Sequence, residues 1–179
     1  RPELLETLSF AIVERFDFLQ EEQRNYFQDS FGDVVTLKQV KSLKELDLPS
    51  AFFIANEIFD AFSCELIFKD KIGTVSEGKI VFEEEDGWVS EKAKKYHKDR
   101  GEIAVGYEAF ALEMKEAAKR FEFMTYDYGE MDARPDFSIR VYKEHEVFPL
   151  FDDNLKLDEE FFVSVLTCDV PFDILCDDS

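Results

Sequence analysis

The sequence predicts an α/β protein with a mainly parallel sheet covered by helices. Three short apolar runs indicate strands, at residues 7–14, 34–37 and 51–56, and two segments with helical character, 17–28 and 39–46, separate them. Strands that alternate with helices at this spacing are typical of parallel sheets with right-handed crossovers. We therefore expect an open sheet in which these three strands and a fourth, at residues 121–126, lie side by side.

Local signals define the first elements. Residues 7–14 form an apolar run that ends in an acid, as a buried strand does. Asp17 stands where an N-cap would lie, and Gln20 follows three residues later, as in a capping box. The second helix, 39–46, is expected to end before Pro49, because proline cannot continue a helix.

The second half of the chain adds a different pattern. Residues 64–69 and 79–83 are predicted to be strands joined by a hairpin-like segment. Residues 106–120 have apolar side chains at three- and four-residue steps, which predicts an amphipathic helix. Residues 121–126 and 137–142 are further strand candidates.

No repeat, low-complexity segment or linker divides the sequence. We therefore predict a single domain over residues 1–179, with an insertion at about 64–106.

The charge of −20 makes nucleic acid a poor partner, because phosphates would be repelled. A basic protein or cationic substrate fits better, although acidity for solubility alone is the open alternative. No apolar run approaches the roughly 20 residues of a membrane span, and no signal peptide is recognisable. Three cysteines without CxxC spacing and two scattered histidines predict no metal site and a cytoplasmic protein with reduced thiols. A homo-oligomer is left open.

Polar residues at the carboxyl ends of the predicted strands are the candidate site, since ligands of open parallel sheets bind there. Glu14 is placed to accept hydrogen bonds from ribose hydroxyls, although any strand can end in an acid. Asn56, Glu57 and Asp60 follow the third strand, and Asp127 follows residues 121–126. The alternative for Asn56-Glu57-x-x-Asp60 is a capped helix start.

A nucleotide-binding sheet normally has a glycine-rich turn after its first strand. None of the seven glycines forms GxGxxG or follows a strand ahead of Glu14. If residues 7–14 are the second strand, the first strand and its glycine loop would precede Arg1. The missing initial methionine agrees with this expectation.

Two segments resemble motifs of the MidA-type methyltransferases, the family that includes the mitochondrial complex I assembly methyltransferase. Residues 55–61 (ANEIFDA) resemble the family's ANE-x-x-DA signature. Residues 12–23 resemble its VE-x-S-P-x-L-x-x-x-Q segment through Val13, Glu14, Leu19 and Gln23, with Phe16-Asp17 where Ser-Pro is usual.

Three further features extend the resemblance to about residues 8–175. Residues 127–129 (DYG) match the family's strand end, and His145 stands where the following stretch has a family histidine. Residues 166–172 (LTCDVPF) resemble D-x-T-x-H-V-D-F, with Asp169 in place of the histidine.

The resemblance implies a Rossmann-like class I methyltransferase fold that is incomplete in this chain. It implies S-adenosylmethionine (SAM) as the cofactor and methylation of arginine on a respiratory complex I subunit. Without the glycine turn, we expect this chain alone to bind SAM weakly or not at all. The resemblance also implies that Glu14 and Asn56 bind the cofactor, Glu57 and Asp60 are catalytic, and Asp127 and His145 contact the substrate. Activity of this chain by itself is not expected. The alternative hypothesis is a non-catalytic acidic α/β module that binds a basic protein.

Overall fold

The computed structural model describes residues 7–84, 87–131, 136–143, 145–152, 155, 157 and 164–178. The chain divides into two compact units, which are described separately below. Unit 1 comprises Arg1–Phe52 and Leu112–Glu122, and unit 2 comprises Phe53–Ala111 and Phe123–Ser179. Both units contain helices and strands, which confirms the predicted α/β class. The prediction of one domain over 1–179 stays a prediction.

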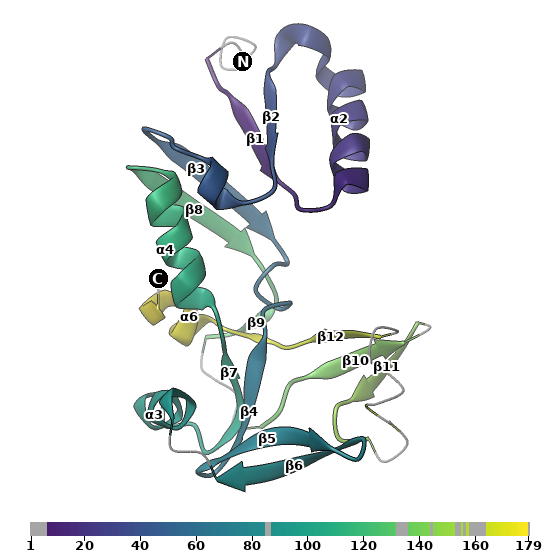
Figure 1. Cartoon of the computed structure of the whole chain (residues 1–179), viewed down its shortest axis with the longest axis vertical. Helices are drawn as coiled ribbons and strands as arrows, with labels where there is room; N and C mark the ends of the chain where they lie inside the picture. Colours follow the sequence, from purple (N-terminus) through teal and green to yellow (C-terminus); the bar gives the residue numbers. More distant parts are fainter. Residues whose placement is uncertain are drawn as a thin grey trace. The chain divides into compact units, whose positions relative to one another are not determined.

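Unit 1 contains a strand–helix–strand segment. Strand β1 (Phe10–Val13) pairs in parallel with β2 (Leu37–Val40), and α2 (Asp17–Phe31) connects them (Figure 1). Gln39 of β2 donates a side-chain hydrogen bond to the carbonyl of Gln20 on α2, at 2.7 Å. The Phe10 and Phe27 rings lie 5.9 Å apart. These contacts hold the helix against the strand pair.

The start of α2 differs from the expected capping box. Phe16 is the N-cap residue and provides no side-chain cap, while Asp17 is already helical and pairs with Lys41 at 2.7 Å. The Gln20 side chain donates to the Glu14 carbonyl, at 2.6 Å, instead of returning to the cap. The prediction of Asp17 as N-cap is therefore wrong, because a nearby lysine and the end of β1 offer these polar groups other partners.

The predicted second strand and second helix are also shifted. A short 3₁₀ helix, η1 (Gly32–Val34), replaces the start of the predicted strand, which lies instead at Leu37–Val40. Residues 39–46 do not form an α-helix. They contain the end of β2 and the 3₁₀ helix η2 (Leu43–Glu45), for which Ser42 and Glu45 form a complete capping box. This local hydrogen-bonding pattern stops the strand and leaves no room for a longer helix.

Strands β3 (Ala51–Asn56) and β8 (Phe121–Tyr126) pair with each other, and both occur at the predicted residues. They run in the same direction, since the Ala51 amide donates to the Arg120 carbonyl and the Glu57 amide to the Tyr126 carbonyl. The four predicted strands therefore form two separate pairs, β1–β2 and β3–β8, and the expectation of one continuous sheet is wrong for the described pairing. Apolar alternation identifies strands and their buried faces, but it does not specify pairing partners.

The region after β3 forms an antiparallel sheet in unit 2, in the order β6-β5-β4-β7. Its strands are β4 (Cys64–Phe68), β5 (Lys71–Ser76), β6 (Lys79–Glu84) and β7 (Arg100–Ala104). β4 and β6 were predicted, whereas the segment expected to join them contains the additional strand β5. Helix α3 (Trp88–Lys95) packs on this sheet through Val89 and Ala93.

The remaining elements complete unit 2. A second antiparallel sheet has the order β11-β10-β12, with β10 (Arg140–Lys143), β11 (Glu146–Pro149) and β12 (Val165–Thr167). Strand β9 (Gly129–Glu130) pairs in parallel with β13 (Val170–Pro171), and α6 (Phe172–Asp178) follows directly. None of the described helices is long and apolar enough to cross a membrane.

Aromatic residues form the core of unit 2 nearest to the carboxyl end of β3. Phe59 is only 1% exposed, and its ring lies 5.2 Å from that of Tyr107 on α4 (Tyr107–Ala117) and 5.9 Å from that of Phe123 on β8. Val170 and Leu175 belong to the same cluster. The loop that follows β3 is therefore anchored by a buried ring.

We predict that Phe59→Ala lowers the free energy of unfolding by about 3–5 kcal/mol, because it leaves a cavity among closely packed rings. The matched control is Phe18→Ala on α2, where the ring is 64% exposed and the loss should stay within about 0.5 kcal/mol. Chemical denaturation measures both values. Equal losses in the two variants would contradict the assigned core.

Candidate active site

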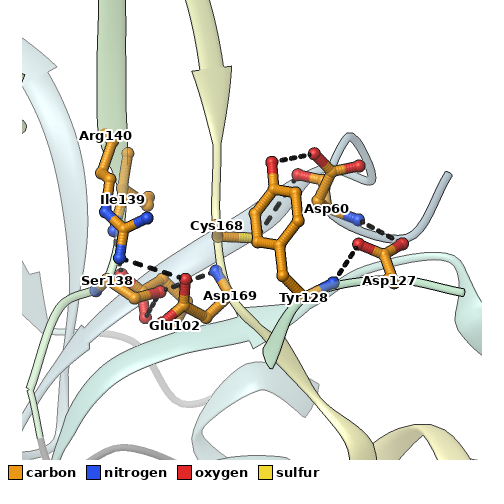
Figure 2. Close-up of polar contacts among 9 residues, drawn as sticks. All are labelled: Asp60, Glu102, Asp127, Tyr128, Ser138, Ile139, Arg140, Cys168 and Asp169. Atoms are coloured by element: carbon orange, nitrogen blue, oxygen red, sulfur yellow. Dashed lines mark hydrogen bonds and ion pairs between the residues drawn. The ribbon is translucent and has the colours of Figure 1, made fainter. Parts of the chain in front are cut away.

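The carboxylate of Asp127 connects the ends of β3 and β8. Its Oδ2 accepts hydrogen bonds from the amides of Phe59, at 2.9 Å, and Asp60, at 3.4 Å. Its Oδ1 accepts from the amide of Tyr128, at 2.9 Å (Figure 2). An ionised carboxylate accepts several hydrogen bonds at once, so this side chain can fix both loops. These contacts assign Asp127 a structural role, and its predicted contact with substrate stays a prediction.

Asp60 is 7% exposed and receives a hydrogen bond from the Tyr128 hydroxyl at its Oδ2, at 2.5 Å (Figure 2). This bond to the Asp60 carboxylate, aided by desolvation, raises the pKa of Tyr128 to about 12. Tyr128 therefore keeps its proton at neutral pH and remains a donor. The other oxygen of Asp60, Oδ1, has no hydrogen-bond partner in the part of the chain that the structure describes.

The backbone of Asp60 is held by the segment between β12 and β13. The Cys168 amide donates to the Asp60 carbonyl, at 3.2 Å, and the Cys168 thiol lies 3.7 Å from the same oxygen. The Val170 amide donates to the Tyr128 carbonyl, at 3.1 Å. The loops after β3 and β8 and this third segment thus form one hydrogen-bonded group.

Glu57 lies in the loop after β3, three residues before Asp60. It is exposed, and its side chain has neither a hydrogen bond nor an ion pair with any residue that the structure describes. Its φ of 49° lies in the left-handed region, which is unfavourable for a residue with a long side chain. Its amide nevertheless donates to the Tyr126 carbonyl, at 2.8 Å, so pairing of β3 with β8 maintains the strained backbone.

Asn56 and Glu14 are the predicted cofactor ligands. Asn56 is the last residue of β3 and is exposed next to Glu57. Glu14 lies in unit 1, directly after β1, and its amide donates to the Val40 carbonyl, at 2.9 Å. Its carboxylate accepts from the Phe16 amide, at 2.9 Å, and weakly from Gln23, at 3.4 Å. Convergence of Glu14 with the unit 2 residues stays a prediction.

The Glu14 carboxylate fits the role of a ribose ligand. Each of its oxygens accepts one hydrogen bond from the described residues, and a carboxylate oxygen has capacity for two. It is half-buried at the carboxyl end of a parallel strand, where such ligands bind. Gln23, which donates to this carboxylate, belongs to the same segment, residues 12–23, that resembles the family motif.

His145 lies in the turn between β10 and β11, with a φ of 71°. It is exposed and makes no described contact with the other predicted site residues. Its predicted role in substrate binding stays a prediction.

Tyr128 and Cys168 contact Asp60 in the candidate site, although the sequence patterns did not select them. Tyr128 follows Asp127 in the DYG triplet, so the triplet was a signal that could have identified it. Cys168 occurs in the motif near the C-terminus, but nothing in the sequence places it beside Asp60.

A second polar cluster lies around Glu102 of β7, which is 6% exposed. Its Oε1 accepts from the amides of Ser138, at 2.6 Å, and Ile139, at 3.1 Å (Figure 2). The Ser138 hydroxyl accepts from the Asp169 amide, at 3.0 Å. Burial raises the pKa of Glu102, and it lowers the pKa of the neighbouring Lys98. This cluster fixes the segment before β10 to β7.

The comparisons with known proteins agree with these features. A family model described as "Putative S-adenosyl-L-methionine-dependent methyltransferase" matches residues 1–170. The chain therefore belongs to this family, which confirms the predicted class of enzyme family and its cofactor, SAM. No curated protein matches the chain.

Two crystal structures of COG1565 superfamily proteins from Burkholderia thailandensis have the same fold. One is a native structure of an uncharacterized protein, with a TM-score of 0.70 and 17% identity over 95% of this chain. The other is bound to S-adenosyl-homocysteine, with a TM-score of 0.70 and 16% identity over 95% of this chain. The present chain spans about half of their lengths, 49% and 47%.

We predict that Glu102→Gln stabilises the protein increasingly as the pH rises above the ordinary glutamate pKa near 4.5. Because the folded-state pKa is raised, the stability that Glu102 contributes is present at low pH and is lost as the pH rises through that pKa. Glutamine stays neutral, and its Oε1 can still accept from the Ser138 and Ile139 amides.

Urea denaturation from pH 4 to pH 8 tests this expectation, with the exposed Glu21→Gln as control. The difference in unfolding free energy between Glu102→Gln and the unsubstituted protein should grow with pH. A difference that is constant, or that shrinks as the pH rises, would refute the assignment.

Proposed function

We propose that the protein containing this chain is a SAM-dependent methyltransferase of the MidA type, with a Rossmann-like class I fold, that methylates arginine on a respiratory complex I subunit in the cytoplasm. The observation that carries this proposal is Glu57, an exposed carboxylate at the end of β3 that has no partner among the described residues and is held at a φ of 49°. Strain of this kind persists only where the surrounding structure enforces it, and it concentrates at functional sites. The choice of a complex I subunit rests on the resemblance alone.

Glu14 and Asn56 are the residues that would hold the cofactor. The Glu14 carboxylate accepts ribose hydroxyls, and the Asn56 amide supplies a donor and an acceptor beside Glu57. When bound, SAM supplies a methyl group that is already activated by its sulfonium. The protein's contribution is therefore alignment of the acceptor and exclusion of water rather than bond activation.

Glu57 would bind and orient the acceptor. A guanidinium is planar and positively charged, and a carboxylate can accept hydrogen bonds from two of its nitrogens in a bidentate pair. When the pair uses Nε and one Nη, the other Nη is directed away from Glu57 and is free to accept the methyl group. Methylation of that nitrogen releases one N–H proton, for which the Glu57 carboxylate would be the acceptor. No described cation forms an ion pair with Glu57, so none of the described side chains has to be displaced before the acceptor binds.

Asp60 and Tyr128 would support the binding of the acceptor by Glu57. The Tyr128 hydroxyl holds Asp60 in one orientation, and Asp60 keeps one oxygen without a described partner. Asp60 therefore adds a second negative charge three residues from Glu57. The net charge of −20 favours the approach of an arginine-bearing protein.

We predict that Glu57→Gln, in the natural protein that carries this chain, reduces methyl transfer about 30- to several-thousand-fold while SAM binding is nearly unchanged. The substitution removes a charge-assisted pair worth about 2–5 kcal/mol, which corresponds to this range of rates. Glu14→Gln should do the reverse and weaken SAM binding first. Transfer of a labelled methyl group and calorimetry with SAM measure the two effects.

The matched control is Glu77→Gln. Glu77 is also exposed and has a φ of 50°, but it lies in the turn between β5 and β6. Its replacement should leave methyl transfer unchanged. If Glu57→Gln retained normal turnover and only lowered the melting temperature, Glu57 would be a loop residue without a catalytic role, and a non-catalytic binding module would become the better hypothesis.

A further inference from the structure

Unit 2 contains a cavity of about 830 Å³ between its two antiparallel sheets. β4, β5 and β6 line one side, and β10 and β12 line the other. The wall is mainly aliphatic, with Leu66, Ile80, Ile139, Val141, Leu150 and Leu166 among the lining residues. The volume lies within the range of about 300–1,000 Å³ that is usual for small-molecule sites.

The loop that carries the candidate active site forms part of this wall. Residues 60–63 line the cavity, together with Thr167 and Cys168 from the segment that is hydrogen-bonded to the Asp60 carbonyl. Asp60 is thus shared between the cavity and the hydrogen-bonded group that includes Tyr128 and Asp127. Glu57 precedes it by three residues in the same loop.

The charges on the wall are of one sign. Asp60 and Glu65 line the cavity, and among the residues that the structure describes no lysine, arginine or histidine lines it. The Oδ1 atom of the buried Asp60 has no described partner, so it is available to a ligand. A carboxylate or phosphate would be repelled here, whereas a cation attached to an apolar body complements both the charge and the aliphatic wall.

We propose that this cavity binds the apolar body of a cationic acceptor substrate, and that Asp60 receives its positively charged nitrogen. The inference rests on the proposed function and deepens it, because it specifies the acceptor as a guanidinium or amine joined to a bulky apolar group. Burial of that group supplies binding free energy from a part of the substrate that does not react, and this energy positions the nitrogen at Asp60, three residues after Glu57 in the same loop.

Three probes with the same alkyl chain test the proposal in calorimetric titrations without SAM: octylguanidinium, 1-octanol and octanoate. Octylguanidinium should bind at least about tenfold more tightly than 1-octanol, and octanoate should bind more weakly than either. Asp60→Asn should remove the advantage of octylguanidinium and leave the affinity for 1-octanol within about twofold.

Two variants on one strand separate the cavity from the outer surface. Leu166 lines the cavity, whereas its neighbour Val165, 63% exposed, does not. Leu166→Asn should weaken octylguanidinium and 1-octanol about tenfold, and Val165→Asn should change neither. Both residues are largely exposed, at 49% and 63%, so both variants should fold.

No binding at millimolar concentration, equal binding of octanoate, or equal effects of the Leu166 and Val165 substitutions would overturn the proposal. Because these titrations need neither SAM nor turnover, their result is independent of the Glu57→Gln assay. Probe binding without methyl transfer would leave the cavity site intact and reject the proposed enzyme. Methyl transfer without probe binding would reject the cavity site and leave the proposed enzyme activity intact.

Discussion

The geometry of the candidate site depends on one carboxylate accepting three backbone hydrogen bonds. Asp127 receives the amides of Phe59 and Asp60 from the loop after β3, and the amide of Tyr128 from its own loop. Backbone amides at the end of a strand need partners when they leave the ladder, and a side-chain carboxylate satisfies several together. The two strand ends are thereby joined at a fixed spacing, and the residues between them have little conformational freedom.

The functional features follow from that restriction. Phe59 inserts its ring into the core one residue before Asp60, while Glu57 stays exposed two residues earlier. The backbone makes this change from surface to core within three residues, and the positive φ of Glu57 is part of that sharp turn. The same loop then brings Asp60 to the wall of the apolar cavity. This short segment therefore contains Glu57 with its strained backbone and the buried Asp60, and it contributes to the wall of the aliphatic cavity.

Sequence patterns predicted the elements whose signals are local. Residues 51–56 and 121–126 alternate between half-buried and exposed positions, and both strands occur as predicted. The helix predicted over residues 39–46 does not form, because Ser42 and Glu45 favour a short capped 3₁₀ turn over a longer helix. The arrangement of these strands as two separate pairs, β1–β2 and β3–β8, was not predictable. Alternation of apolar and polar residues contains no information about which strands pair.

The candidate site was predictable in part. The rule that polar residues gather at carboxyl ends of strands selected Asp60 and Asp127, which the structure brings into contact. It did not distinguish the free Glu57 from the hydrogen-bonded Asp127, because the difference arises from backbone amides that a sequence pattern does not locate. Cys168 lies 108 residues from Asp60 in sequence, and only the fold places them together.

The most direct test of this account is amide hydrogen exchange in Asp127→Asn, with the exposed Asp29→Asn on α2 as control. Asparagine has one acceptor oxygen in place of two, so it cannot hold both loops. If Asp127 joins the two loops, the Phe59, Asp60 and Tyr128 amides should exchange at least about tenfold faster in Asp127→Asn. Core amides such as that of Ile103 should keep their protection, and methyl transfer should fall in parallel. Unchanged exchange at Phe59 and Asp60, with methyl transfer retained, would contradict the central role assigned to Asp127.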